Sequence, residues 1–269
     1  MAGSIRYWLA PVGTIGDLVT APKQRRGYAV ELLVVFGTTL GLSGLRSLIS
    51  LLDALLRPEP LNKQTVALNA QQATVSLLDL FAQLTSVLQL LCWGGLGAYL
   101  LWRAGTGLAR IGLDRTRPGR DLLGGIGLAA LIGIPGLGFY LLTRALHVNL
   151  TVVPSALGDT WWRVPALLLA AFGNAWAEEV LVVGYLLTTL RRFGWSENRG
   201  LLIAALLRGS YHLYQGFGGF LGNVVMGLVF GRVWQRTNRL WVLIVAHTVL
   251  DVVSFVGYAL FRAVLPALA

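Results

Sequence analysis

Two adjacent acidic residues, Glu178 and Glu179, lie inside a segment that is otherwise almost entirely apolar, from Trp162 to Leu187. A charged side chain in the middle of a bilayer costs roughly 2.5–3.5 kcal/mol on insertion scales. A pair kept at that cost predicts a site within the membrane. A desolvated, correctly placed carboxylate is suited to take a proton from water as a general base.

The same half of the chain holds four more ionisable residues within apolar segments: Arg208, His212, His247 and Asp251. His247 and Asp251 are four residues apart, so they face the same way on a helix, and the same holds for Arg208 and His212. Three helices thus carry three carboxylates and two imidazoles, more ionisable groups than the packing of helices requires. They predict acid–base chemistry, with a purely structural network of buried ion pairs as the alternative.

The whole composition is that of a membrane protein. The 269 residues are 55% hydrophobic and 13% charged, and the mean hydropathy is +0.67, whereas soluble domains are about 25% charged. We therefore predict an all-α, polytopic transmembrane helical bundle. The single cysteine, Cys92, excludes a disulfide framework and a cysteine-type zinc site; we expect it to be a small buried apolar residue.

A membrane span needs about 20 mostly apolar residues. The sequence predicts seven spans and leaves an eighth open, with the fifth and sixth meeting at Gln215–Gly219 either in a tight hairpin or as a partly re-entrant pair. The predicted spans are 28–52, 74–102, 122–143, 162–190, 200–215, 217–235 and 240–262.

Basic residues alternate between the connecting segments. Fifteen of the 22 Lys and Arg residues lie in the N-terminal segment or in the segments 103–121, 191–199 and 232–239. By the positive-inside rule these segments are cytoplasmic, which places the N-terminus inside and, with seven spans, the C-terminus outside. The net charge of +10 thus sets orientation and contacts anionic lipid, and we expect no nucleic-acid partner. Short loops suggest a bacterial plasma membrane.

This pattern divides the chain into four parts: a cytoplasmic segment 1–27, N-terminal transmembrane helices and loops 28–159, a catalytic transmembrane core 160–262, and a tail 263–269. In the predicted orientation His247 lies about 10 Å from the inner end of its helix, and Glu178 and His212 about 18 Å from theirs. The three side chains are expected to meet in a cavity open to the cytoplasm.

The order Glu178-Glu179, His212, His247-x-x-x-Asp251 resembles the CPBP family, which includes the CAAX prenyl proteases of the Rce1 type and the Abi or bacteriocin-immunity proteins. The resemblance covers residues 160–260 and rests on Glu-Glu-x-x-x-Arg, Phe-x-x-x-His and His-x-x-x-Asn/Asp. The chain departs from it twice: Val183 stands at the arginine position and Arg208 at the phenylalanine position. We predict that these departures compensate, with Arg208 supplying the charge partner of Glu179 and leaving that glutamate a supporting role.

The resemblance implies an intramembrane endopeptidase that hydrolyses a peptide bond with a glutamate-activated water. Glu178 would be the general base, and His212 would share the water and then protonate the leaving amine. His247 would donate to the developing oxyanion. Asp251 would either orient His247 through its Nδ1–H group or be protonated, and we favour the orienting role.

Several alternatives stay open. The favoured mechanism needs no cofactor, but Glu178, His212, His247 and Asp251 could instead bind zinc with a water ligand. A catalytically silent scaffold or immunity protein, or a proton-coupled transporter, would also retain such residues. The expected partners are membrane lipids and a membrane-associated peptide or lipidated protein in a cell membrane.

Overall fold

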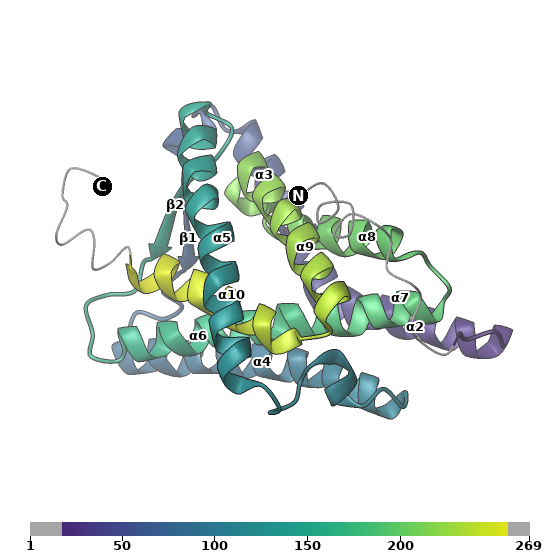
Figure 1. Ribbon diagram of the computed structural model, residues 1–269. Helices are drawn as coiled ribbons and strands as arrows, with labels where there is room; N and C mark the ends of the chain where they lie inside the picture. The colour runs from purple at the N-terminus through teal and green to yellow at the C-terminus, as the bar shows by residue number, and fades with distance from the viewer. Residues whose placement is uncertain (1–17, 258–269) are drawn as a thin grey trace, which may run out of the picture.

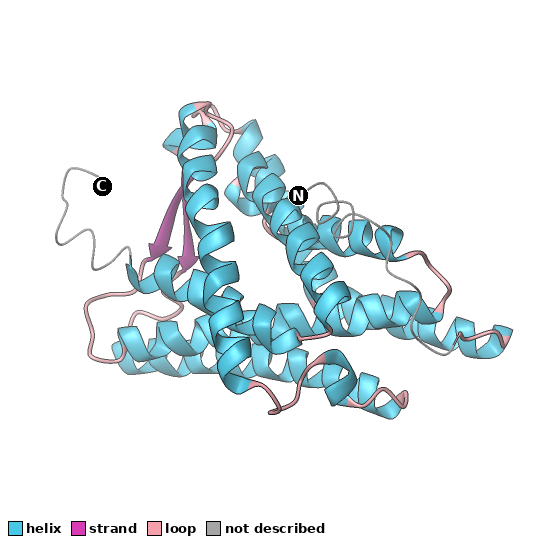
Figure 2. Cartoon of the chain, in the orientation of Figure 1, coloured by secondary structure: helices cyan, strands magenta, loops and turns pink. Residues whose placement is uncertain are grey.

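The computed structural model describes residues 18–257, and most of these are helical (Figures 1 and 2). The helices are α2 (Pro22–Thr38), α3 (Leu40–Leu56), α4 (Ser76–Arg103), α5 (Pro118–Ala145), α6 (Arg163–Glu178), α7 (Thr188–Arg192), α8 (Glu197–Ser210), α9 (Phe217–Thr237) and α10 (Leu240–Val252). Short 3₁₀ turns are η1 (Leu61–Lys63), η2 (Leu108–Ile111) and η4 (Leu213–Gln215), and the π-helical segments are η3 (Glu179–Leu187) and η5 (Val253–Gly257). Most of the predicted segment 1–27, the end of the last predicted span and the tail 263–269 lie outside the described residues.

Five described helices are long and apolar enough to cross a membrane, and a sixth span results if the bent pair α2 and α3 is counted as one. The two helices of this pair meet at 46°. The span predicted at 200–215 corresponds to α8, which has only 14 residues and falls short of the length that a crossing requires. The described helices therefore do not reach the seven or eight predicted spans, and the orientation of the N-terminus stays a prediction.

A small β-sheet corrects the expectation of a purely helical chain. Strand β1 (Thr65–Asn69) pairs in parallel with β2 (Thr151–Ser155), with Thr65 opposite Thr151. The strands lie beside α5 in Figure 1. They belong to two segments that we had assigned to loops between spans. Parallel partners far apart in sequence leave no hairpin signal in the local pattern.

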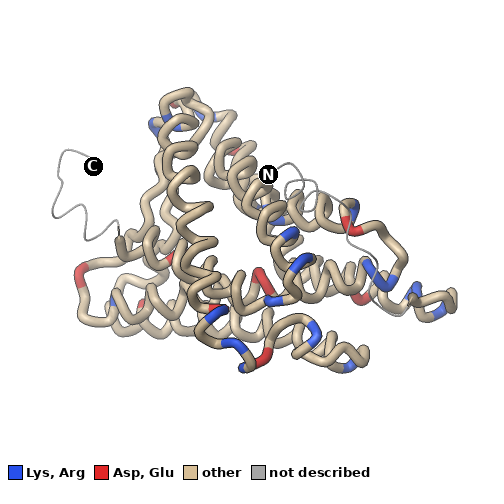
Figure 3. The backbone as a smooth tube through the Cα atoms, viewed as in Figure 1, with Lys and Arg blue, Asp and Glu red and all other residues tan. Residues whose placement is uncertain are grey.

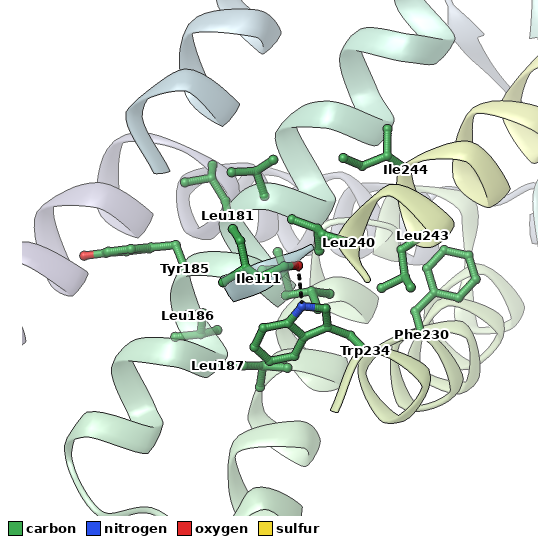
Figure 4. Close-up of a cluster of buried hydrophobic side chains, with 14 of the residues drawn as sticks. Ile111, Leu181, Tyr185, Leu186, Leu187, Phe230, Trp234, Leu240, Leu243 and Ile244 are labelled. Atoms are coloured by element: carbon green, nitrogen blue, oxygen red, sulfur yellow. Dashed lines mark hydrogen bonds between the residues drawn. The ribbon is translucent and has the colours of Figure 1, made fainter. Parts of the chain in front are cut away.

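The rod formed by α6, η3 and α7 is the centre of the fold. About two thirds of its apolar window is buried, compared with a third or less for each of the other candidate spans. Every residue of η3 is buried, and apolar side chains from α9 and α10 surround it (Figure 4). Trp234 of α9 closes this cluster by donating its indole N–H to the carbonyl of Ile111 at 3.1 Å.

The outer helices expose apolar side chains instead, as expected where the solvent is lipid. Cys92 lies on such a face of α4 and is exposed, so the prediction that it is buried was wrong. An apolar run in a membrane helix does not by itself distinguish the lipid-facing side from the protein-facing side.

Helices α8 and α9 pack closely through small residues. A Cβ atom on Gly227 would lie 2.9 Å from the Cα of Ala205, and one on Gly231 would lie 2.5 Å from a methyl group of Leu201. These two glycines are four residues apart and therefore face α8 together. The turn that joins the helices needs Gly216, whose φ of 105° is open to glycine but not to other residues.

Basic residues gather mainly at the lower and right-hand ends of the bundle in Figure 3. One of them, Arg239, lies in the turn before α10 and bridges Asp114, at 2.7 Å, and Asp121 at the start of α5. The side-chain hydroxyl and backbone N–H of Thr116, and then Arg239, hold the pKa of Asp114 at about 2.

This cluster predicts a pH-dependent contribution to stability. The folded pKa of Asp114 lies below the ordinary value of 3.8, so its contribution is present above about pH 4 and is lost as the pH falls toward 2. We expect the melting temperature of the Asp114→Asn variant in detergent to change less than that of the wild type between pH 4 and pH 2. An equal change in melting temperature for the two proteins between pH 4 and pH 2 would contradict the prediction.

Candidate active site

Glu178 and Glu179 lie where the regular α-helix of α6 changes into the π-helical segment η3. π-helical turns are rare and frequently occur at functional sites. The two carboxylates differ in burial, because Glu178 is 9% exposed whereas Glu179 is completely buried. The two adjacent carboxylates therefore lie in different surroundings.

Arg208 projects from α8 onto the glutamate pair. Its Nη2 atom donates to Oε1 of Glu179 and lies 3.8 Å from Oε2 of Glu178. Arg208 is 1% exposed, and its guanidinium lies over the ring of Phe230 at 5.5 Å. The predicted ion pair between Arg208 and Glu179 is thus present in the structure, while Val183 lies buried in η3 among apolar neighbours.

His247 reaches the same oxygen of Glu179 from α10. Its Nδ1 atom lies 2.8 Å from Oε1 of Glu179, and because a carboxylate only accepts, Nδ1 carries the proton. Its Nε2 atom lies 3.7 Å from Oδ1 of Asp251. The expectation that Asp251 holds the Nδ1–H group was therefore wrong. Glu179 holds that group, because the packing of η3 against α10 brings the glutamate to the ring first.

The spacing predicts Arg208 and His212 on one continuous helix, but His212 lies outside that helix in the structure. Helix α8 ends at Ser210, and His212 lies in the turn between α8 and η4. Its Nδ1 atom lies 2.9 Å from the carbonyl of Arg208, so Nδ1 donates and Nε2 is left to act on other groups. Two backbone hydrogen bonds hold the following turn against the chain near Asn149, from Leu150 to Gln215 and from Phe217 to Val148.

Asp251 forms the edge of the cluster. Its Oδ2 atom accepts a hydrogen bond of 3.3 Å from the side-chain amide of Asn174 on α6. Asn174 lies one helical turn before Glu178, on the same face. Glu178 in turn interacts electrostatically with His247, Arg208 and His212. The structure thus brings together all six residues that the sequence singled out.

Sequence reasoning also missed a contact between Tyr211 and Glu178. Tyr211 donates its hydroxyl to Oε2 of Glu178 at 2.7 Å. The predicted span 200–215 put Tyr211 on a continuous helix, where it would point about 100° away from His212. The helix stops before Tyr211, and no local signal other than the glycines that follow marks this stop.

The zinc alternative requires three or four ligands that converge on one point. Among residues 18–257, no group of three or more His, Cys, Asp or Glu side chains is arranged to hold a metal ion. In both histidines the Nδ1–H is held, by Glu179 in His247 and by a backbone carbonyl in His212, which leaves Nε2 as the atom that could bind a metal, the usual arrangement in metal sites. The zinc alternative therefore stays a prediction.

Residues 160–253 match the family described as type II CAAX prenyl endopeptidase Rce1-like. No curated protein and no solved structure matches the chain. The matched segment contains Glu178, Arg208, His212, His247 and Asp251, and it ends at Val253, the first residue of η5. With its membrane helices the chain is a multi-pass membrane protein, and its residues 160–253 are similar to the CAAX prenyl endopeptidase family.

Proposed function

We propose that the protein hydrolyses a peptide bond of a membrane-associated peptide or lipidated protein, with a water molecule activated by Glu178. The observation that carries the proposal is the arrangement around this carboxylate. Its Oε2 atom is held by Tyr211, and the groups in electrostatic contact with it include both His212 and His247. A general base must first lie within hydrogen-bond reach of the proton that it takes, and only then does its pKa decide its efficiency.

The reaction has two proton transfers. Glu178 takes a proton from water as the water oxygen bonds to the substrate carbonyl carbon. The C–N bond then breaks as the proton on Glu178 passes to the leaving amine through Nε2 of His212, which leaves Glu178 ionised again. The products are a new carboxylic acid and a new amine, so atoms and charges balance without an oxidant or a second substrate.

Glu179, His247 and Asp251 form the electrostatic half of the site. Glu179 holds the Nδ1–H of His247, and this contact fixes the orientation of the ring. Asp251 lies 3.7 Å from Nε2, and the Nε2–H of a protonated imidazole can donate to the oxyanion. The amide of Asn174 donates to the other oxygen of Asp251.

A reconstitution assay tests the proposal. Purified protein in liposomes is incubated with membrane-anchored peptides in water enriched in ¹⁸O, and the products are analysed by mass spectrometry. We expect cleavage with one ¹⁸O atom in the new carboxyl group. No cleavage of any membrane-anchored peptide or lipopeptide, together with an unchanged cellular phenotype of the Glu178→Ala variant, would favour a silent scaffold.

Chelation tests the metal alternative. In the glutamate mechanism the only groups that act on the water are protein side chains, so dialysis against 1,10-phenanthroline or EDTA in large molar excess over the protein should leave kcat within about twofold. Loss of activity on chelation, restored by Zn²⁺ but not by Mg²⁺, would replace the glutamate mechanism with a metal-dependent one.

A further inference from the structure

Tyr211 lies between the proposed base and its histidine partner. It is the first residue after α8 and is 6% exposed. Its hydroxyl donates to Oε2 of Glu178 at 2.7 Å, and the centre of its ring lies 4.8 Å from that of His212. One side chain therefore contacts both groups that would act on the water.

The contact makes the two oxygens of Glu178 different. Oε2 accepts from Tyr211 and lies 3.8 Å from Arg208. Oε1 accepts no hydrogen bond from the residues that the structure describes, and Glu178 keeps a small exposed area whereas Glu179 has none. With Oε2 held, the carboxylate cannot turn freely, and Oε1 is left to receive the proton.

Tyr211 is itself held from outside the matched segment. The hydroxyl of Ser47 on α3 donates to the backbone carbonyl of Tyr211 at 2.9 Å, and this contact is buried. Next to it, Gly44 lets α3 approach Ser210 so closely that a Cβ atom on the glycine would lie 2.5 Å from the serine hydroxyl oxygen. Helix α3 thus fixes the turn in which Tyr211 and His212 lie.

We infer that Tyr211, seated by Ser47, is a positioning residue that holds Glu178 with Oε1 facing the reacting water. This inference rests on the proposed hydrolysis. It assigns a role to the N-terminal half of the chain, because α3 lies outside residues 160–253. Without the hydroxyl of Tyr211, the carboxylate would sample orientations in which neither oxygen reaches the water.

The test compares two Tyr→Phe variants. Tyr211→Phe removes the hydroxyl that binds Glu178. Tyr185→Phe is the matched control, because Tyr185 is also buried and donates to a glutamate, Glu31, at 2.9 Å. For Tyr211→Phe we expect kcat to fall about 10- to 100-fold, the range for groups that orient a reactive partner, with KM and the melting temperature unchanged. For Tyr185→Phe we expect kcat within about twofold of the wild type.

Ser47→Ala provides a second measurement that leaves the phenol in place. It should lower kcat in the same direction but less than Tyr211→Phe, again with KM unchanged. An unchanged kcat in Tyr211→Phe overturns the inference. A decrease in kcat that is fully explained by a lower melting temperature of the variant overturns it as well. If Glu178→Gln is inactive while Tyr211→Phe is fully active, the role of Tyr211 fails and the proposed hydrolysis stands. If the wild type cleaves nothing, both fail.

Discussion

Replacing Glu178 with glutamine should abolish measurable hydrolysis, with a decrease in kcat of about 10²–10⁴-fold, the usual contribution of a general base. Glutamine keeps nearly the same shape and still offers an oxygen to the hydroxyl of Tyr211, which lies 2.7 Å from Oε2 in the wild type. The amide cannot take a proton from water at neutral pH. The loss should therefore be chemical, with little change in folding.

The measurement is single-turnover cleavage of a reconstituted peptide substrate, alongside thermal unfolding in detergent. Glu31→Gln is the matched control, because Glu31 also accepts a phenolic hydroxyl, that of Tyr185, but lies away from the histidines. Glu31→Gln should retain activity within about twofold. A Glu178→Gln variant that cleaves at the wild-type rate would remove Glu178 from the chemistry.

The second large effect is expected at Arg208. Among residues 18–257, Arg208→Leu leaves the carboxylate of Glu179 with His247 as its one remaining basic partner, although the side chain of Glu179 is completely buried. Removing one partner of a buried ion pair costs about 3–5 kcal/mol, and whole domains are stable by only about 5–15 kcal/mol. We therefore expect a sharply lower melting temperature, low yield in the membrane fraction, and loss of activity in what remains.

Arg46→Leu is the matched control, because Arg46 is an exposed arginine on α3 for which no polar contact is present among the described residues. Its melting temperature should stay close to that of the wild type. The double variant Arg208→Leu, Val183→Arg returns the arginine to the position of the family pattern, four residues after Glu179, and should recover part of the lost stability. Intact folding and activity in Arg208→Leu would show that the pairing with Glu179 is dispensable.

The identity of the site residues could be read from the sequence because burying charge in a membrane is costly. Glu178, Glu179, His212 and His247 stand out in apolar segments, and each is in the cluster that the structure forms. The pairing of Arg208 with Glu179 was also predictable, since a buried carboxylate needs a partner and position 183 no longer offers one. The prediction that His247 and Asp251 face the same way is confirmed, because both lie on the regular helix α10.

The partners of individual atoms were not predictable. The assignment of His247 Nδ1 to Asp251 was wrong, because proximity along one helix says nothing about a carboxylate that η3 brings from the other side. The contact of Tyr211 with Glu178 was missed because α8 ends at Ser210 rather than continuing to residue 215. Each residue on a helix turns the next side chain by about 100°, so one misplaced helix end redirects every side chain after it.

The sequence by itself therefore determined that this is a helical membrane protein and which ionisable residues gather at the candidate site, since both follow from composition and from the cost of charge in lipid. Only the tertiary structure decided which oxygen of Glu178 is held, which carboxylate orients His247, and that α3 supports the turn containing His212. These depend on the packing of helices far apart in the chain and on the change from α- to π-helical geometry at Glu179, neither of which leaves a local pattern in the sequence.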